Sequence, residues 1–336
     1  MYKVFLNDYY DITNLVLELP NIKESLITET SDLEYKASFK IKNQSEWLSK
    51  DYENSIVSNT PVTFYKLYIR DNNQLIYQGT INNIIEQPDK SCTVNCKTIS
   101  DNLTKELTRS LPNLTLLDII IQITQEFELD YDHYSWLNID SLFNFTTFNI
   151  TATESSPLTL IDLLKEMSES LGIWIYLKNN IIFCAPFVSF EDGYKFSLAS
   201  SDILDAEIEN SFDELRTNYN IKYGVDSVVL DTNNGNIGKL ARNIYGDKPI
   251  ELDATYSSNL TIKDETTAVQ VGNWYLERYK DVFDIITFTV KRDLANLIDL
   301  LDVMKIEKFD KRYVILDKEW NLNMNTVKLL AWEVVS

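Results

Sequence analysis

The sequence predicts an α+β protein that is mainly β, with two strand-rich regions on either side of a small α+β domain. In residues 1–105 and 203–336, apolar and polar residues alternate along several segments, which is the period of a half-buried strand. The middle of the chain instead carries apolar residues at helical spacing. With 336 residues the chain is also too long for one ordinary core, so several domains are expected.

Residues 1–105 are expected to form the first β domain. Alternation is clearest over residues 35–42, where apolar positions take turns with Lys and Ser. The segments 62–69 and 74–85 flank Asp71-Asn72-Asn73, a turn sequence that indicates a hairpin. Closely spaced strands joined by short turns predict an antiparallel barrel or sandwich.

The three cysteines are predicted to be reduced core residues. Cys92 and Cys96 lie four residues apart in an alternating run, so both face one side of a strand, roughly 13 Å apart and out of disulfide range. Cys184 lies in an apolar strand. This usage is typical of a protein made in a reducing cytoplasm.

Residues 106–202 are expected to form a small α+β domain. The phrase Leu-Thr-Leu-Leu-Asp at 114–118 returns as Leu-Thr-Leu-Ile-Asp at 158–162. In each copy the Thr is expected to cap a helix, with the Asp at the third helical position. We interpret the repeat as one capping solution used twice; a duplication is the alternative. The predicted elements are a helix from Leu116 to about Phe127, a second helix ended by Gly172, and a hairpin of 173–177 with 181–187 around Asn179-Asn180.

Residues 203–336 are expected to form the second β domain, interrupted by a helix-bearing excursion at about 225–280. The predicted helix, 266–280, places Ala268, Val271 and two tyrosines on one face. Asn233-Asn234-Gly235-Asn236 indicates a hairpin or an extended loop. The predicted strands are 215–223, 228–230, 283–290, 313–316 and 327–335.

The formal net charge is −20, and it is densest in the middle of the chain, where residues 106–201 hold 4 basic and 13 acidic groups. A chain of this sign will not wrap DNA or lie on anionic lipid. The charge serves either solubility or an acidic surface past which nucleic acid slides. No signal peptide and no transmembrane helix are expected, because no apolar run approaches about 18–20 residues.

No catalytic, cofactor-binding or metal-binding residue is predicted. His133, the single histidine, lies in the polar segment 130–134, which is expected to be a loop. One His and three distant cysteines do not supply a zinc site. The residues 226–236 lack the spacing of an EF-hand. Acids are abundant, but no pair stands out as the two carboxylates of a glycosidase. The sequence therefore indicates a protein that is not an enzyme.

Most tryptophans lie inside periodic segments, where packing in the core or at a subunit interface is expected. These are Trp174, Trp274, Trp320 and Trp332.

The C-terminal third carries a resemblance to a known family. A helix ends over 271–279, the strand 284–290 follows, and then come the stretch 297–307, the segment 313–320 and a last strand ending at 330–334. This order resembles the closing half of the trimeric phage tail baseplate hub proteins, and the paired helices of the middle region resemble that family's middle domain. The chain departs from the family at Leu301-Asp302, where members often have a Gly-Asp turn.

The resemblance implies two tube-like antiparallel β-barrel domains flanking a peripheral α+β domain. Three chains would form a homotrimer, a pseudo-sixfold ring that joins the tail tube or distal tail protein to a spike, tip or tape-measure protein. DNA would meet the ring only in transit through its acidic channel. The protein would reside in the virion tail after synthesis in the host cytoplasm, without stable membrane insertion. Trp47, Trp136 or other aromatic residues are expected to anchor subunit contacts.

Two other functions stay open on the sequence alone. One is a carbohydrate-binding or receptor-binding module of a phage tail, which would use exposed Trp and Tyr side chains. The other is a cell-wall glycan hydrolase with paired acids.

Overall fold

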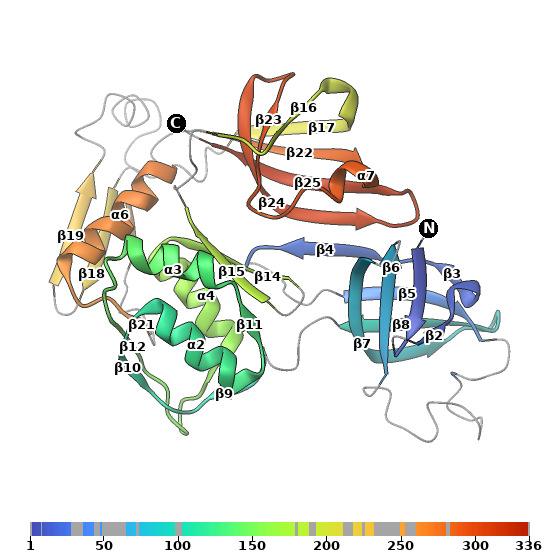
Figure 1. Ribbon diagram of the computed structural model, residues 1–336, viewed down its shortest axis with the longest axis horizontal. Helices are drawn as coiled ribbons and strands as arrows, with labels where there is room; N and C mark the ends of the chain where they lie inside the picture. The colour runs from blue at the N-terminus through green and yellow to red at the C-terminus, as the bar shows by residue number, and fades with distance from the viewer. Residues whose placement is uncertain are drawn as a thin grey trace.

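The computed structural model describes residues 2–7, 9–27, 36–43, 48, 65–71, 74–97, 103–178, 181–187, 193–210, 218–223, 226–231, 249–252, 260–279 and 283–334. The predicted class is confirmed: the chain is mainly β, with a helical middle (Figure 1). Among the described helices, none combines the length and apolar character needed to cross a membrane.

The first sheet curls into a barrel, in the order β2-β1-β6-β7-β8-β5-β3 (Figure 1). Its end strands, β2 and β3, are successive parts of one segment joined by the short turn Thr13–Leu15. The strand at one end of the sheet therefore continues directly into the strand at the other end. The predicted hairpin is confirmed, since β6 and β7 pair antiparallel. The strands are β1 (Tyr2–Leu6), β2 (Tyr10–Asp11), β3 (Val16–Glu18), β5 (Lys36–Lys42), β6 (Lys66–Asp71), β7 (Gln74–Glu86) and β8 (Ser91–Lys97).

The second barrel follows the order β16-β23-β24-β25-β22-β17. Its end strands are again successive parts of one segment, here joined by the turn Ser200–Asp202. The strands are β16 (Phe196–Leu198), β17 (Ile203–Asn210), β22 (Asp284–Lys291), β23 (Val303–Ile306), β24 (Lys311–Asn321) and β25 (Thr326–Glu333).

The two barrels share one topology. The order β5-β8-β7-β6 in the first corresponds to β22-β25-β24-β23 in the second, and each run follows the same chain order. The directions agree too. β16 runs parallel to β23, and β2 runs in the same direction as β6 because β1 is antiparallel to both. Strand β1 is the one addition in the first barrel.

The middle domain packs helices on the sheet β11-β15-β14. Both predicted caps are confirmed: Thr115 Oγ1 accepts a hydrogen bond from the Asp118 amide at 3.2 Å, and Thr159 Oγ1 accepts one from Asp162 at 3.2 Å. The predicted hairpin, β14 with β15, is also present. The elements are α2 (Leu116–Phe127), α3 (His133–Leu142), α4 (Leu160–Leu171), β11 (Asp130–Tyr131), β14 (Ile173–Lys178) and β15 (Ile181–Pro186).

Gly172 ends α4 with a φ of +64°, a left-handed conformation that favours glycine.

Helix α3 is a difference from the sequence expectation, which placed His133 in a loop. His133 is the first residue of this helix, and Asp132 caps it by accepting a hydrogen bond from the Ser135 amide at 2.8 Å. The apolar residues of this helix are too few to form a continuous stripe, so its periodicity does not reveal it.

The excursion packs helix α6 (Glu265–Tyr279) across the sheet β19-β18-β20. A Cβ on Gly272 would lie 2.2 Å from the Cδ1 atom of Leu230 and 2.6 Å from that of Ile221, so a larger residue would force both side chains to move. The sheet strands are β18 (Asn218–Tyr223), β19 (Asp226–Asp231) and β20 (Pro249–Leu252). The predicted turn at 233–236 lies outside the described residues.

Short strands tie the excursion and the middle domain together. β21 of the excursion pairs with β12 of the middle domain, which also pairs with β10. A separate two-stranded pair joins β9 and β13. These strands are β9 (Glu106–Leu107), β10 (Leu111–Leu114), β12 (Phe148–Ile150), β13 (Leu158–Thr159) and β21 (Leu260–Thr261).

Asp140 of α3 supplies a buried second cap for α2, and its replacement tests that role. Its Oδ1 accepts a hydrogen bond from the Leu116 amide at 3.1 Å, and burial outweighs this contact and raises the pKa of the carboxyl above its ordinary value. The folded state therefore retains a proton that the unfolded state has lost, so stability falls as pH rises from about 4 through the raised pKa. We expect Asp140→Asn, which keeps the acceptor oxygen, to remove the contribution of Asp140 to the slope, and Asp140→Ala to cost about 1–3 kcal/mol.

Chemical denaturation at a series of pH values measures both effects. Asp130→Asn, at an exposed position of the same domain, is the control and is expected to leave the contribution of Asp140 in place. A stability difference between the wild type and Asp140→Asn that stays constant across this window would contradict the assignment.

Candidate functional site at the junction of the barrels

Strand β4 (Asn21–Ser25) leaves the first barrel and joins the second. It pairs antiparallel with the distal half of β24, from Asn21 opposite Asn321 to Ser25 opposite Asp317. The proximal half of β24 pairs with β23 on the same side. Figure 1 shows β4 crossing between the two barrels. The second sheet is thus completed by a strand that lies almost 300 residues away in the chain.

Polar contacts fix the register of β4. Lys23 Nζ lies 2.9 Å from Asp317 Oδ2. Trp320 Nε1 donates to Glu24 Oε1 at 2.9 Å. Just before the strand, the backbone of Leu19 exchanges two hydrogen bonds with the Asn323 side chain, at 3.2 and 2.8 Å. Since Asn323 lies in the turn between β24 and β25, the end of the β2–β3 segment docks on that turn.

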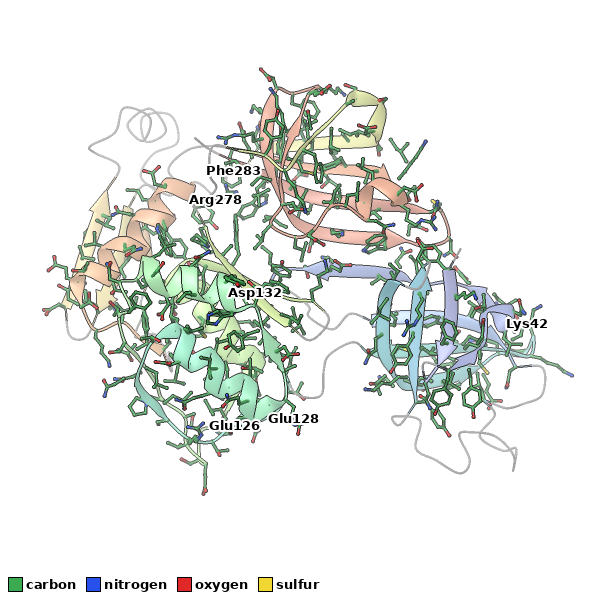
Figure 2. All side chains as sticks on the ribbon, in the orientation of Figure 1. Lys42, Glu126, Glu128, Asp132, Arg278 and Phe283 are labelled. Carbon is green, nitrogen blue, oxygen red and sulfur yellow. The ribbon has the colours of Figure 1, made fainter. Side chains whose placement is uncertain are left out.

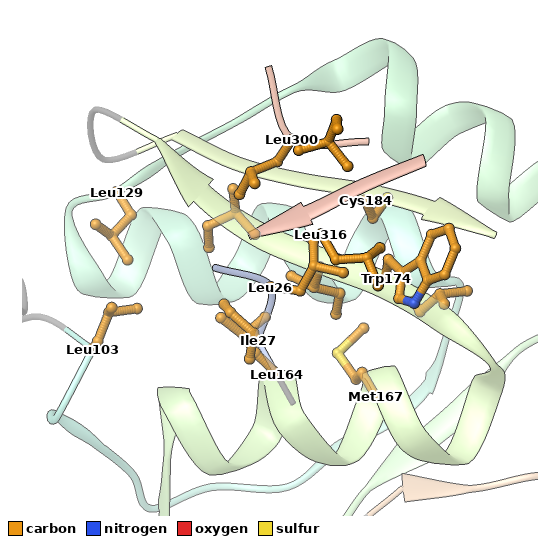
Figure 3. Close-up of a cluster of buried hydrophobic side chains, with 14 of the residues drawn as sticks. Leu26, Ile27, Leu103, Leu129, Leu164, Met167, Trp174, Cys184, Leu300 and Leu316 are labelled. Carbon is orange, nitrogen blue, oxygen red and sulfur yellow. The ribbon is translucent and has the colours of Figure 1, made fainter. Parts of the chain in front are cut away.

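The apolar side chains of this segment enter the core of the neighbouring domains. Ile22 is 4% exposed and Ile27 is fully buried. The Ile27 amide donates to Ile175 O of β14 at 2.7 Å, which carries the contact into the middle domain. Figure 3 shows the cluster around this point, which includes Leu26, Ile27, Leu164, Met167, Trp174 and Leu316.

A second contact joins the barrels through helix α7 (Arg292–Ala295). Arg292 Nε lies 3.4 Å from Asp71 Oδ2, and both side chains are largely buried. The guanidinium also lies 5.2 Å from the centre of the Tyr2 ring, at the start of β1. Replacing only one partner of such an ion pair is costly, because the other charge is then left buried without its partner.

Lys318 is a buried cation at the centre of the junction. Its side chain is 3% exposed, and its Nζ donates to the carbonyl oxygens of Ala295, at 3.3 Å, and Ile298. Burial lowers the pKa of Lys318, and the Glu24 carboxylate at 4.0 Å acts in the opposite sense. Burial also raises the pKa of the adjacent Asp317, in spite of its ion pair with Lys23. Lys318 therefore links the end of α7 and the residues after it to the half of β24 with which β4 pairs.

Two further ion pairs tie the loop before β23 to neighbouring segments. Lys178, at the end of β14, pairs with Asp299, and Lys195 Nζ lies 2.8 Å from Asp302 Oδ2. Partial burial acts to raise the pKa of Asp299, but Lys178 together with Lys318 and Lys195 outweighs it and holds this pKa below its ordinary value. In the same loop, Leu301 has a φ of +66°, the conformation that a glycine at this position would adopt without strain.

Arg278 clamps helix α6 to the second barrel. Its side chain is 4% exposed, and its guanidinium carbon lies 4.0 Å from the centre of the Phe283 ring and 4.4 Å from that of Trp332. Nη1 donates to Glu333 O at 3.0 Å. The ring centre of Trp174, in the middle domain, lies 5.9 Å from the same guanidinium carbon. Figure 2 labels Arg278 and Phe283 at the meeting point of these elements.

The sequence did not single out Arg278 or Lys318, although both leave a signal. Arg278 occupies the helical face that Val271 and Tyr275 define, seven residues after Val271. Lys318 alternates with Leu316 and Trp320 along β24, so it shares their inward-facing side. A charged residue at an apolar position of a periodic pattern indicates a buried, partnered charge.

The residues considered for chemistry are dispersed. His133 is exposed at the start of α3, between the rings of Tyr131 and Tyr134. The three cysteines are buried and free, and burial raises the pKa of Cys92 to about 11. Over the part of the chain that the structure describes, no three His, Cys, Asp or Glu side chains are grouped to hold a metal ion.

The expectation that Trp136 anchors subunit contacts is wrong. The side chain is fully buried, and its Nε1 donates to Ile182 O at 3.1 Å, because α3 packs on β15. Trp47 lies outside the described residues. Trp174 and Trp320 are each 3% exposed, as expected for core residues, and cannot offer a platform for a sugar.

The fold is that of solved phage tail proteins. The 43 kDa tail protein of prophage MuSo2 from Shewanella oneidensis is 12% identical and matches 98% of this chain and 97% of its own, with a TM-score of 0.64. A tail protein from Neisseria meningitidis MC58 is 10% identical, covers 99% and 96%, and has a TM-score of 0.66. Prophage tail protein gp18 from Listeria monocytogenes EGD-e is 9% identical, covers 98% and 94%, and has a TM-score of 0.56.

No protein-family model and no curated protein matches the sequence. The likeness lies in the whole fold, barrels and middle domain together, which is the fold that the resemblance implied.

Proposed function

We propose that this protein is a structural component of a phage or phage-derived tail, the hub at the tail tip or baseplate. Three chains form a pseudo-sixfold ring that joins the tail tube to a tip or spike protein and surrounds the DNA exit channel. Residues 1–105 supply the first barrel and, through β4, one strand of the second; β16 and residues 203–336 supply the rest of the second barrel, and residues 106–195 form the peripheral domain. The role is assembly rather than catalysis, and the protein resides in the virion tail.

The observation that carries this proposal is the common topology of the barrels. Two modules with the same strand order, linked in one chain, allow three chains to present six similar units to a sixfold partner. The contacts at the junction support it, because β4, Arg292 and Lys318 hold the two barrels in one arrangement. The full-length likeness to tail proteins agrees with this use of the fold.

The sign of the net charge supports a DNA channel. Every copy carries −20, so a ring of three carries three times that charge. Acidic side chains that line the channel repel the phosphates of DNA and prevent adhesion during transit.

The test is the symmetry of the assembled particle. We expect the purified chain to sediment with three times the monomer mass at high concentration. Projection images are expected to show six similar lobes around a central opening. Particles that stay monomeric at every concentration, or rings without threefold symmetry, would reject the proposal.

A further inference from the structure

The junction inside the chain shows how one barrel docks on the next. In the first barrel, the chain leaving β3 reaches the turn between β24 and β25, where Leu19 and Asn323 share two hydrogen bonds. One side of this contact, on the first barrel, is therefore the end of the bent segment that closes that barrel. The other side is the turn that follows the long strand β24 of the second barrel.

The shared topology identifies the counterpart of each side. The segment β16–β17 corresponds to β2–β3, and the β7–β8 turn, residues 87–90, corresponds to the β24–β25 turn. We propose that, in the ring, the end of β17 of one copy docks on the β7–β8 turn of the next copy. This inference rests on the proposed function, because it names the contact that closes the ring between chains.

Strand β17 has the exposure of a docking surface. It lies at an end of the sheet order, and nearly all of its side chains are exposed or half-exposed. Asp205, Glu207 and Glu209 alternate along one side, and Leu204 and Ile208 are 51% and 41% exposed. A long, exposed edge strand with apolar side chains is a natural site of association, and its charges restrict which surface can meet it.

Three lysines, Lys40, Lys42 and Lys90, surround the β7–β8 turn, against Asp89 in the turn and Glu86 at the end of β7. Lys90 lies in the turn itself, and its carbonyl accepts a hydrogen bond from the Asn43 amide at 2.9 Å, which places the end of β5 beside the turn. Lys42 stands on that strand end, and Figure 2 shows it at the outer tip of the first barrel. Lys40 is nearby and pairs with Asp89 at 3.3 Å. Acids on β17 and lysines at this turn make the two surfaces complementary.

The geometry has a consequence for assembly. The two surfaces are different patches of one chain, so the contact is head-to-tail and closes into a ring when the rotation is one third of a turn. Both patches are largely exposed, so salt screens their attraction. Salt equally screens the repulsion between chains that each carry a net charge of −20, so the variants are compared with the wild type at one ionic strength.

A charge-swap series tests the contact. We expect the double variant Glu207→Lys, Glu209→Lys to raise the concentration needed for half-assembly at least about tenfold, and Lys42→Glu, Lys90→Glu to do the same, because like charges then face each other. All four changes in one chain restore opposite charges at every contact, so assembly should recover to near the wild-type concentration. Sedimentation at fixed salt measures each.

The control is Asp130→Lys with Glu154→Lys, which makes the same change of charge at exposed positions of the middle domain. It should assemble like the wild type. A wild type that forms threefold rings while both reversed variants do so equally well overturns the docking inference and leaves the proposed function standing. A wild type that never forms a ring overturns both.

Discussion

Replacing Arg278 with alanine is expected to lower the free energy of unfolding by about 3 kcal/mol, since it removes two cation–π contacts and a charge-assisted hydrogen bond from a buried site. The guanidinium lies 4.0 Å from the Phe283 ring centre and 4.4 Å from that of Trp332, and it donates to Glu333 O. Because Arg278 belongs to α6 and all three partners belong to the second barrel or lead into it, the loss should also loosen the boundary between them. Equilibrium denaturation measures the stability, and hydrogen exchange in α6 measures the loosening.

Two further variants separate charge from volume. Arg278→Met keeps most of the side-chain volume but loses the cation, so we expect a loss between those of the wild type and the alanine variant. Arg109→Ala removes an exposed arginine that pairs with Glu126 at 3.0 Å, and it should cost no more than about 1 kcal/mol. A methionine variant as stable as the wild type would show that the charge contributes nothing here.

Sequence reasoning succeeded where the determinants are local. The caps at Thr115 and Thr159 depend on a side chain and an amide three residues apart, so the helix starts follow directly from the sequence. The strands β5, β8 and β25 alternate over a buried face, and this period is visible without a partner. Gly172 marks the end of α4 because the conformation needed there favours glycine.

Contacts between distant segments were not predictable in the same way. The segment of β4, Asn-Ile-Lys-Glu-Ser, gives no local sign that its partner is β24 rather than a strand of its own barrel. The topology shared by the barrels is also invisible in the sequence, because it resides in the order of pairing. Arg278 and Lys318 occupy an intermediate position: their patterns show that they are buried, but not which rings or carbonyls they meet.

The β4 junction is the place where we expect the largest single loss. Ile27→Ala should cost about 2–5 kcal/mol, since it leaves a cavity around a fully buried side chain between the middle domain and the second barrel. The effect should concentrate at the junction: β4 and the distal half of β24, Asp317 to Asn321, should exchange their amide hydrogens faster than β5 and β8 of the first barrel. Denaturation and hydrogen exchange on the same variant measure both.

Leu17→Ala is the matched control, because Leu17 lies in the preceding strand, β3, and is 48% exposed. It should change stability by less than about 0.5 kcal/mol and leave the junction protected. Ile27→Val, which removes one methylene, should cost about 0.5–1.5 kcal/mol. If Ile27→Ala instead accelerates exchange equally in both barrels, the two barrels unfold as one unit. The β4 junction would then not open separately from the barrels, as its contacts indicate that it does. If exchange stays slow throughout, the junction does not depend on this side chain, and the ion pairs of Arg292 and Lys23 would have to hold the barrels together.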